Sequence, residues 1–369
     1  MRFSCYKDDL NDAMQFAIRA VAVKPQTPVL SGIYLRAEGS VLEVQANNYS
    51  MGIIVRIPVN TEESGEIVVS GKRFQEFVRN MPDNTITFYD EDNTLVMESG
   101  GANVRLLTMT TQDFPKVRMP ESENSFKIRT SVLHELIRKT VFAAARNEEG
   151  ARPIFTGVCF ELVENRIALI ATNTHRLALT RELLPAAYNA MSFVVPAETL
   201  RGIMNRIDPK EPDNYVTVSY SRRYVTFTFD NVFVTARLIE GSFPPYDRVI
   251  PTSSLTSVTV NTKEFKEALD LVALMSKETE YNTVRFVFNE EGIEISSDSP
   301  EIGGAAKTVE AYIGGEELDI AFNAAYIAEV LKVIDTKKVN IALNDKYSPA
   351  AFTETENENF IYIATPVRT

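Results

Sequence analysis

Apolar and polar residues alternate along this chain in a pattern that occurs three times. The three copies are SGIYLRAEGSVLEVQANNYS from Ser31, TGVCFELVENRIALIATNTH from Thr156 and NTVRFVFNEEGIEISSDSPE from Asn282. Each copy has the period of a half-buried strand, then a short polar turn, then a second alternating run. Each follows a stretch with apolar residues at helical spacing, namely Leu10, Ala13, Met14, Ala17, Ile18 and Val21, then Leu133, Leu136, Ile137, Val141 and Ala144, then Phe265, Ala268, Leu269 and Val272. The pattern predicts three related domains.

Each domain contains the pattern a second time. The segments that begin at Glu66, Met191 and Glu317 each predict a strand, a helix and a strand meander. Phe-Pro-containing stretches at 113–120 and 242–251 are typical of extended connectors. We therefore predict an α+β protein whose domains span 1–121, 122–252 and 253–369, each a duplicated unit of one helix on an antiparallel meander.

Composition is that of a folded protein without export signals. The 369 residues are 44% hydrophobic and include only two cysteines, which is too few for a disulfide framework. The first twelve residues lack the basic-then-apolar profile of a signal peptide, and no apolar run is long enough to cross a bilayer. We expect a cytoplasmic protein with no membrane contact.

The charge distribution differs from the net charge. The chain carries −12 overall, which disfavours binding to nucleic acid, whereas the six predicted helix windows together carry +6. If the domains follow a common curve, these helices line its concave side. Solubilising helix surfaces carry similar charges, so a solvated face and a DNA-binding face both remain open.

The stretch ATNTHRLALT, 171–180, places His175 beside Arg176 at the start of an alternating run. A histidine could act as a general base or metal ligand, but no nucleophile motif or second histidine stands at a suitable spacing, and His134 falls on a separate predicted helix. A structural histidine and a recognition site are the other interpretations. The residues alone do not decide between them.

Four segments carry a resemblance to a known family. They are RPIFTGVCFELVENRIALIATNTHRLAL from Arg152, ARLIEGSFPPYDRVIP from Ala236, QTPVLSGIYL from Gln26 and the terminal TPVR. Together they resemble the bacterial DNA sliding clamps, the beta subunits of DNA polymerase III, from end to end. The resemblance implies the DNA clamp fold and a head-to-tail homodimer, each chain forming half of a ring that encircles double-stranded DNA without reading its sequence.

The resemblance also implies the partners. A clamp loader would place the ring on DNA, and DNA polymerases and repair proteins would attach through short clamp-binding peptides. The family is non-catalytic, so the expectation is a processivity factor with no cofactor, no metal and no catalytic residue.

DNA contacts are expected from basic residues. The resemblance assigns Lys24, Arg73 and Arg152, and placement on the predicted third and fourth helices adds Arg138, Lys139, Arg146, Arg201 and Arg206. The sequence departs from the family at Glu198, where a basic residue is common, and at 147–153, which lacks a tyrosine pair. Both departures weaken the expected DNA contact at those places.

A peptide pocket is expected between the second and third domains. By position its residues are Phe155, Thr172, Thr174, His175, Arg176, Leu177, Pro244, Arg248, Val249, Tyr281, Tyr347, Pro366, Val367 and Arg368. Apolar side chains would receive leucine and phenylalanine anchors while polar groups orient the peptide. Asn173 and Thr174 stand where the family often has Asp-Gly, and Thr369 replaces an apolar end.

The resemblance finally implies a subunit interface. The edge strand 103–109 of one chain would pair with a strand of the other, and Val104 and Leu106 would pack near Leu274 and Met275.

Overall fold

A computed structural model of the chain describes residues 1–118, 124–146, 152–211, 214–276, 282–299 and 303–368. By its internal contacts the chain divides into two compact units: unit 1 comprises 1–133 with 198–238, and unit 2 comprises 134–197 with 239–369. The helices are α1 (Lys7–Ala17), α2 (Gly71–Asn80), α3 (Thr130–Arg138), α4 (Ala197–Arg206), α5 (Thr262–Ser276) and α6 (Ala324–Leu331). None of the described helices is long and apolar enough to span a membrane.

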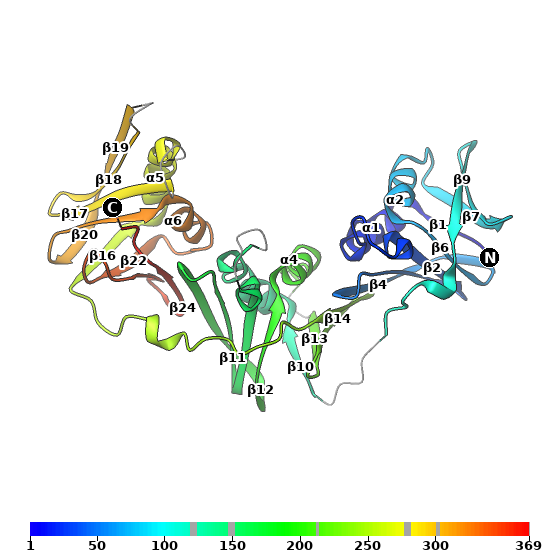
Figure 1. Ribbon diagram of the computed structural model, residues 1–369, viewed down its shortest axis with the longest axis horizontal. Coiled ribbons are helices and arrows are strands. Elements are labelled where there is room, and N and C mark those ends of the chain that lie inside the picture. The colour runs from blue at the N-terminus through cyan, green and yellow to red at the C-terminus, as the bar shows by residue number, and fades with distance from the viewer. Residues whose placement is uncertain (119–123, 147–151, 212–213, 277–281, 300–302, 369) are drawn as a thin grey trace. The chain divides into compact units, whose positions relative to one another are not determined.

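Unit 1 contains one 13-stranded antiparallel sheet, in the order β10-β13-β14-β15-β4-β3-β2-β6-β9-β8-β7-β1-β5. Its strands are β1 (Arg2–Tyr6), β2 (Gly32–Glu38), β3 (Val41–Asn47), β4 (Met51–Pro58), β5 (Asn60–Glu63), β6 (Gly65–Ser70), β7 (Thr85–Glu91), β8 (Thr94–Ser99), β9 (Ala102–Met109), β10 (Asn124–Arg129), β13 (Tyr215–Tyr220), β14 (Tyr224–Phe229) and β15 (Val232–Arg237). Helices α1 and α2 contact each other and pack on this sheet (Figure 1).

Unit 2 contains a seven-stranded sheet, β11-β12-β24-β23-β22-β16-β20, and a four-stranded sheet, β19-β18-β17-β21. The first comprises β11 (Gly157–Thr172), β12 (Arg176–Pro196), β16 (Thr256–Asn261), β20 (Ala311–Gly315), β22 (Lys338–Leu343), β23 (Ala350–Glu354) and β24 (Asn357–Ala364). The second comprises β17 (Thr283–Asn289), β18 (Gly292–Ser299), β19 (Gly303–Val309) and β21 (Leu318–Asn323). Helices α5 and α6 contact each other within this unit.

The predicted sixfold repetition is confirmed in the order of elements. Each of the six helices begins at the residue that directly follows a strand, and at least two strands follow it along the chain. Asparagine side chains start two of these helices: Asn261 accepts hydrogen bonds from the amides of Lys263 and Glu264, and Asn323 accepts from those of Ala325 and Tyr326. Such caps satisfy backbone donors that the first turn leaves free.

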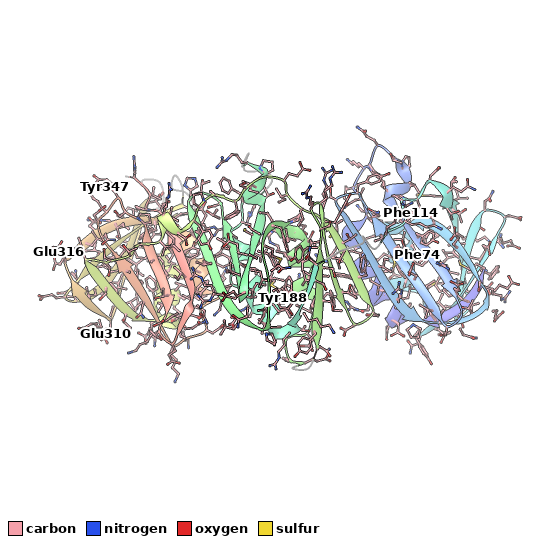
Figure 2. All side chains as sticks on the ribbon, turned by 90° about the horizontal axis from the view of Figure 1, so that it is seen from below. Phe74, Phe114, Tyr188, Glu310, Glu316 and Tyr347 are labelled. Atoms are coloured by element: carbon pink, nitrogen blue, oxygen red, sulfur yellow. The ribbon has the colours of Figure 1, made fainter. Side chains whose placement is uncertain are left out.

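The helix spacing also located the core correctly. Leu10, Ala13 and Met14 of α1 are fully buried, and so is Phe74 of α2, whose ring lies 6.0 Å from that of Phe88 on β7 (Figure 2). Phe265 of α5 is buried in the same way against the four-stranded sheet of unit 2. One apolar face of each helix therefore anchors it to strands.

Two predicted helices are shorter than their apolar pattern indicated. α3 ends at Arg138 and is followed by a separate 3₁₀ turn, Val141–Ala143, so Arg146 does not lie on this helix as predicted. Thr140 explains the break, because its hydroxyl donates to the carbonyl of Leu136 and its backbone no longer continues the helix. α6 likewise ends at Leu331, which leaves the lysines of 332–338 outside it.

The sheets continue across the predicted repeats. In unit 1, β4 pairs with β15 through Val55 and Val232, and in unit 2, β12 pairs with β24 through Leu177 and Ile363. The middle third of the chain therefore contributes strands to both compact units. The predicted domain limits at 121 and 252 stay a prediction.

Candidate functional site

The turn between β11 and β12 is fixed by its own hydrogen bonds. The Thr172 hydroxyl donates to the carbonyl of Arg176 at 2.6 Å, and the Asn173 side-chain oxygen accepts from the amides of His175 and Arg176, both at 3.1 Å. Thr174 has a φ of 80°, a left-handed conformation that is costly for a β-branched residue. Glycine, which has no Cβ atom, would adopt this conformation without that cost.

Arg176 is an internal structural residue. Only 8% of it is exposed, its guanidinium pairs with Glu329 of α6 and donates to the carbonyl of Phe142 at 2.6 Å, and it lies 4.4 Å from the ring centroid of Tyr326. Burial alone would lower the pKa of Arg176, but Tyr362 and Glu329 outweigh that effect and the pKa is raised. Arg176 thus fixes the turn to α6, and its place in the peptide pocket stays a prediction.

His175 contributes its backbone to the site. Its carbonyl accepts from both the amide and the hydroxyl of Thr365, each at 2.9 Å, while its side chain is exposed. Two residues later the amide of Val367 donates to the carbonyl of Ala321 at 2.8 Å. The C-terminal tail is thereby held between the 172–176 turn and β21, with Pro366 and Val367 half-buried and Arg368 exposed.

Apolar residues form the base of the site beside this turn. Phe155 and Leu177 are buried, and Leu177 belongs to a cluster with Cys159 and Ile363. The segment 243–250 packs against the same cluster through Phe243, Tyr246 and Ile250, and Tyr246 donates to Glu161 at 2.7 Å. Between these anchors Pro244 is half-buried, and Arg248 and Val249 are exposed.

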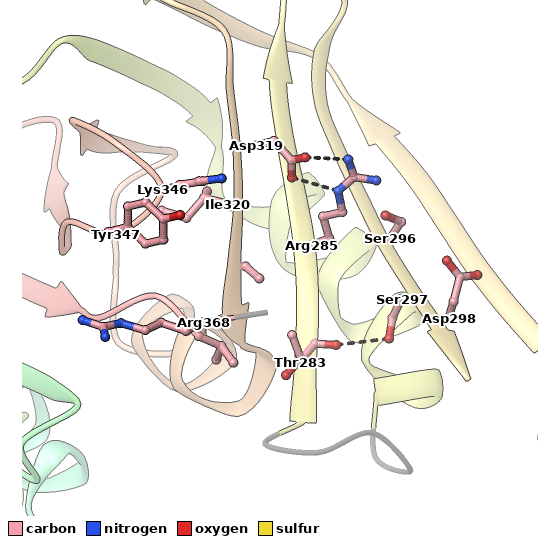
Figure 3. Close-up of a pocket in the computed structure, with 12 residues that line it drawn as sticks. Thr283, Arg285, Ser296, Ser297, Asp298, Asp319, Ile320, Lys346, Tyr347 and Arg368 are labelled. Carbon is pink, nitrogen blue, oxygen red and sulfur yellow. Dashed lines mark hydrogen bonds and ion pairs between the residues drawn. The ribbon is translucent and has the colours of Figure 1, made fainter. Parts of the chain in front are cut away.

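Unit 2 therefore brings most of the predicted pocket together. The turn contacts the tail, and the 243–250 segment shares a core cluster with Leu177. Tyr347, Val367 and Arg368 line a common cavity of about 420 Å³ (Figure 3). Tyr281 lies outside the described residues.

Sequence reasoning missed three residues that hold this site in place. Thr365 anchors the tail, Tyr326 accepts a hydrogen bond from the Asn173 amide at 3.1 Å, and Tyr246 anchors the connector. Each acts through a partner more than 80 positions away in the chain. No local sequence pattern identifies such a pair.

All three residues that the resemblance assigns to DNA contact are exposed cations. Arg73 lies on α2 together with Lys72 and Arg79, and all three are exposed. Lys24 is exposed in a left-handed backbone conformation with a φ of 53°. The exposed Arg152 stacks on the ring of Phe155, with the guanidinium carbon 4.8 Å from the ring centroid.

Lys139 does not fit its predicted role. It is 4% exposed, and its ammonium lies 2.7 Å from Glu354 and 3.1 Å from Glu135. A buried and paired ammonium is not available to a phosphate. We correct its assignment to a structural ion pair.

The other helix cations are also engaged with carboxylates. Arg138 pairs with Glu135 at 2.7 Å and with Asp335, so its charge is largely compensated. Arg206 pairs with Asp12 of α1 at 2.6 Å, and Arg201 lies 3.8 Å from Glu198. Arg146 is exposed but lies beyond the end of α3. The positive charge counted along the predicted helices is therefore larger than the charge that is not paired with carboxylates. Among the helices, α2 has the clearest set of exposed cations.

The predicted interface strand β9 has a largely unpaired edge. β8 pairs with residues 102–107 of this strand, whereas in the described chain β6 reaches only Thr108 and Met109. Leu107 is 79% exposed, and Val104 and Leu106 are half-buried. In unit 2, Leu274 of α5 is 58% exposed and Met275 is half-buried. Both units thus present apolar side chains to solvent at the positions predicted to join two subunits.

Two observations concern metal binding and thiol chemistry in the described part of the chain. It contains no cluster of three or more histidine, cysteine or acidic side chains that could hold a metal ion. Cys5 and Cys159 are free and buried, and burial raises the pKa of each thiol to about 12. Thiols with such a pKa are protonated at neutral pH and are poor nucleophiles.

Comparison with known proteins gives one consistent result. Three family models match in succession: the DNA polymerase III beta subunit N-terminal domain at 1–118, its central domain at 127–245 and its C-terminal domain at 247–368. The beta sliding clamp of Bacillus subtilis is 30% identical over 381 residues, covering 100% of both chains.

Solved structures agree with this result. The DNA polymerase sliding clamp from Bacillus subtilis has a TM-score of 0.93 at 30% identity, and the DNA polymerase III beta subunit from Thermotoga maritima has 0.92 at 30% identity. Each comparison covers 100% of this chain and 99% of the other.

Proposed function

Because the chain belongs to the DNA polymerase III beta subunits, the beta sliding clamps, we propose that it is a non-catalytic processivity factor that encircles duplex DNA as a closed homodimeric ring. The observation that carries this proposal is the succession of three clamp domain matches over nearly the whole chain. In this proposal the protein works in the cytoplasm, needs no cofactor, and is placed on DNA by a clamp loader.

A ring retains DNA by its closed topology, so each contact with DNA can be weak. Exchangeable phosphate contacts permit sliding, whereas contacts with base edges would resist it. The exposed cations of α2, with Lys24 and Arg152, fit such contacts. Arg138, Arg201 and Arg206 are kept as weaker candidates because acidic side chains already face them.

Polymerases and repair proteins would bind the turn–tail site of unit 2. Half-buried Pro244, Pro366 and Val367 and exposed Val249 offer apolar surface beside the buried Leu177 cluster. The fixed turn and tail present backbone groups in one arrangement, which lowers the entropy cost of ordering the site on binding. A short peptide with leucine and phenylalanine anchors suits this surface.

The proposal is tested by retention on DNA of different topology. Protein loaded on a nicked circle should remain through gel filtration, and linearising the circle should release it. The variant Arg73→Glu should load or persist less well than wild type, and Arg36→Glu, at a paired arginine on β2, serves as the matched control. Equal loss from circular and linear DNA would refute the ring and favour a protein scaffold that does not enclose DNA.

A further inference from the structure

The cavity of about 420 Å³ extends beyond the predicted pocket onto the four-stranded sheet. Its lining comes from β17, β18, β21, the loop at 346–347 and the tail, namely Thr283, Arg285, Ser296, Ser297, Asp298, Asp319, Ile320, Ala321, Lys346, Tyr347, Val367 and Arg368. The outward residues of β17 face this space, since Val284 and Phe286 point to the buried side. The family resemblance assigns only three of the twelve to peptide binding, all at the tail side of the cavity.

The sheet side of the cavity carries one arginine and two aspartates, so it has no excess positive charge. Arg285 forms a two-point ion pair with Asp319, with N–O distances of 2.8 and 2.5 Å (Figure 3). This hydrogen bonding lowers the pKa of Asp319, so the pair is charged at neutral pH. Ser297 donates to the carbonyl of Thr283 at 3.2 Å, and Asp298 lies on β18, across the sheet from the tail.

The tail side of the cavity carries two cations. Lys346 and Arg368 are exposed, and neither forms an ion pair with a carboxylate among the described residues, although Lys346 lies close enough to Asp319 to help lower the pKa of that carboxyl. The Lys346 ammonium lies 5.1 Å from the ring centroid of Tyr347, which is 64% exposed. Asp345 shapes the loop that carries Lys346 and Tyr347, because its side chain accepts from the amides of Tyr347 and Ser348 at 2.7 and 2.9 Å.

We propose that this cavity is an extension of the peptide site that binds acidic residues flanking the apolar anchors of a partner peptide. The proposal rests on the proposed function. Val367 and Arg368 belong both to the predicted pocket and to the cavity, so a chain crossing the tail enters it directly. Carboxylates there would meet the ammonium of Lys346 and the guanidinium of Arg368 beside an aromatic face. Partner peptides with the same apolar anchors would then differ in affinity according to the charge of their flanking residues.

The test uses labelled peptides with the same leucine and phenylalanine anchors and compares their Kd values by fluorescence anisotropy. One peptide has no extension, and the others carry two acidic, two amide or two lysine residues at either end. An acidic extension at one end should tighten binding about three- to tenfold over its amide counterpart at low salt, the range for one or two exposed charge pairs. The gain should vanish in high salt.

Variants of Lys346 locate the effect. Lys346→Ala should remove most of the gain and leave the unextended peptide unchanged, and Lys346→Glu should reverse the preference in favour of lysine. Lys263→Ala, at an exposed lysine on α5, is the matched control.

The outcomes separate the two proposals. Equal binding of acidic, amide and lysine extensions, or tighter binding of lysine by wild type, would overturn the extension while the peptide site stands. Failure of every peptide to bind would instead overturn the peptide site in the proposed function.

Discussion

Thr174 shows how one residue can adopt a strained backbone conformation within a hydrogen-bonded turn. Its φ of 80° lies where glycine is favoured, while its side chain is exposed. The neighbouring hydrogen bonds of Thr172 and Asn173 hold the strained backbone in place. The strain therefore arises from the side chain at position 174, and a glycine could adopt the same turn without it.

Replacing Thr174 by glycine should relieve this strain. We expect Thr174→Gly to raise the free energy of unfolding by about 1 kcal/mol, because the cost of a left-handed β-branched residue exceeds the added chain entropy of glycine. Urea denaturation would measure this change in the free energy of unfolding. Thr174→Ala, which keeps the Cβ atom, should gain clearly less, and an equal gain would show that the branching at Cβ and not the Cβ atom itself is responsible.

Lys139 illustrates a charge whose role depends on its burial. We expect Lys139→Met to lower the free energy of unfolding by about 3 kcal/mol, because it leaves the buried carboxylate of Glu354 without its cation. Lys72→Met on the exposed face of α2 should change stability by no more than about 0.5 kcal/mol. Denaturation measures both. Normal stability of the Lys139 variant would show that the Lys139–Glu354 pair does not stabilise the fold.

At the scale of elements, the exposed apolar residues of β9 and α5 lead to a prediction about assembly. Leu274→Lys should weaken self-association about tenfold or more, because a buried anchor at an interface contributes more than about 1.4 kcal/mol. Sedimentation over a concentration series measures this, with circular dichroism to confirm folding. Leu255→Lys, at a leucine that is 59% exposed elsewhere in unit 2, is the control. Equal association of both variants would exclude α5 from the interface.

The elements also show what the sequence could reveal. Strands, turns and the buried faces of α1 and α5 follow from local periodicity, which is why the sixfold repetition was predicted correctly. The ends of α3 and α6 did not follow, because the apolar spacing continues past the point where Thr140 and Lys332 end the helices. The Lys139–Glu354 pair, separated by 215 positions, depends on tertiary packing and has no sequence signal.

At the scale of the whole molecule, the chain repeats three times but forms two compact units. The strands of the middle third join different sheets: β13, β14 and β15 extend the sheet of unit 1, and β11 and β12 belong to unit 2. The sequence repeats show which elements resemble one another. Strand pairing, in contrast, decides which elements stabilise one another.

This division of the middle third has a consequence for how the protein melts. We expect calorimetry to resolve two cooperative transitions, because each compact unit unfolds as a block. Native-state hydrogen exchange should show amides of β13 to β15 opening together with β3 and β4, and not with β11 and β12. Joint opening of β11 to β15 would instead make the middle third an independent folding block. Thermal unfolding of the first third should therefore include β13 to β15, and unfolding of the last third should include β11 and β12.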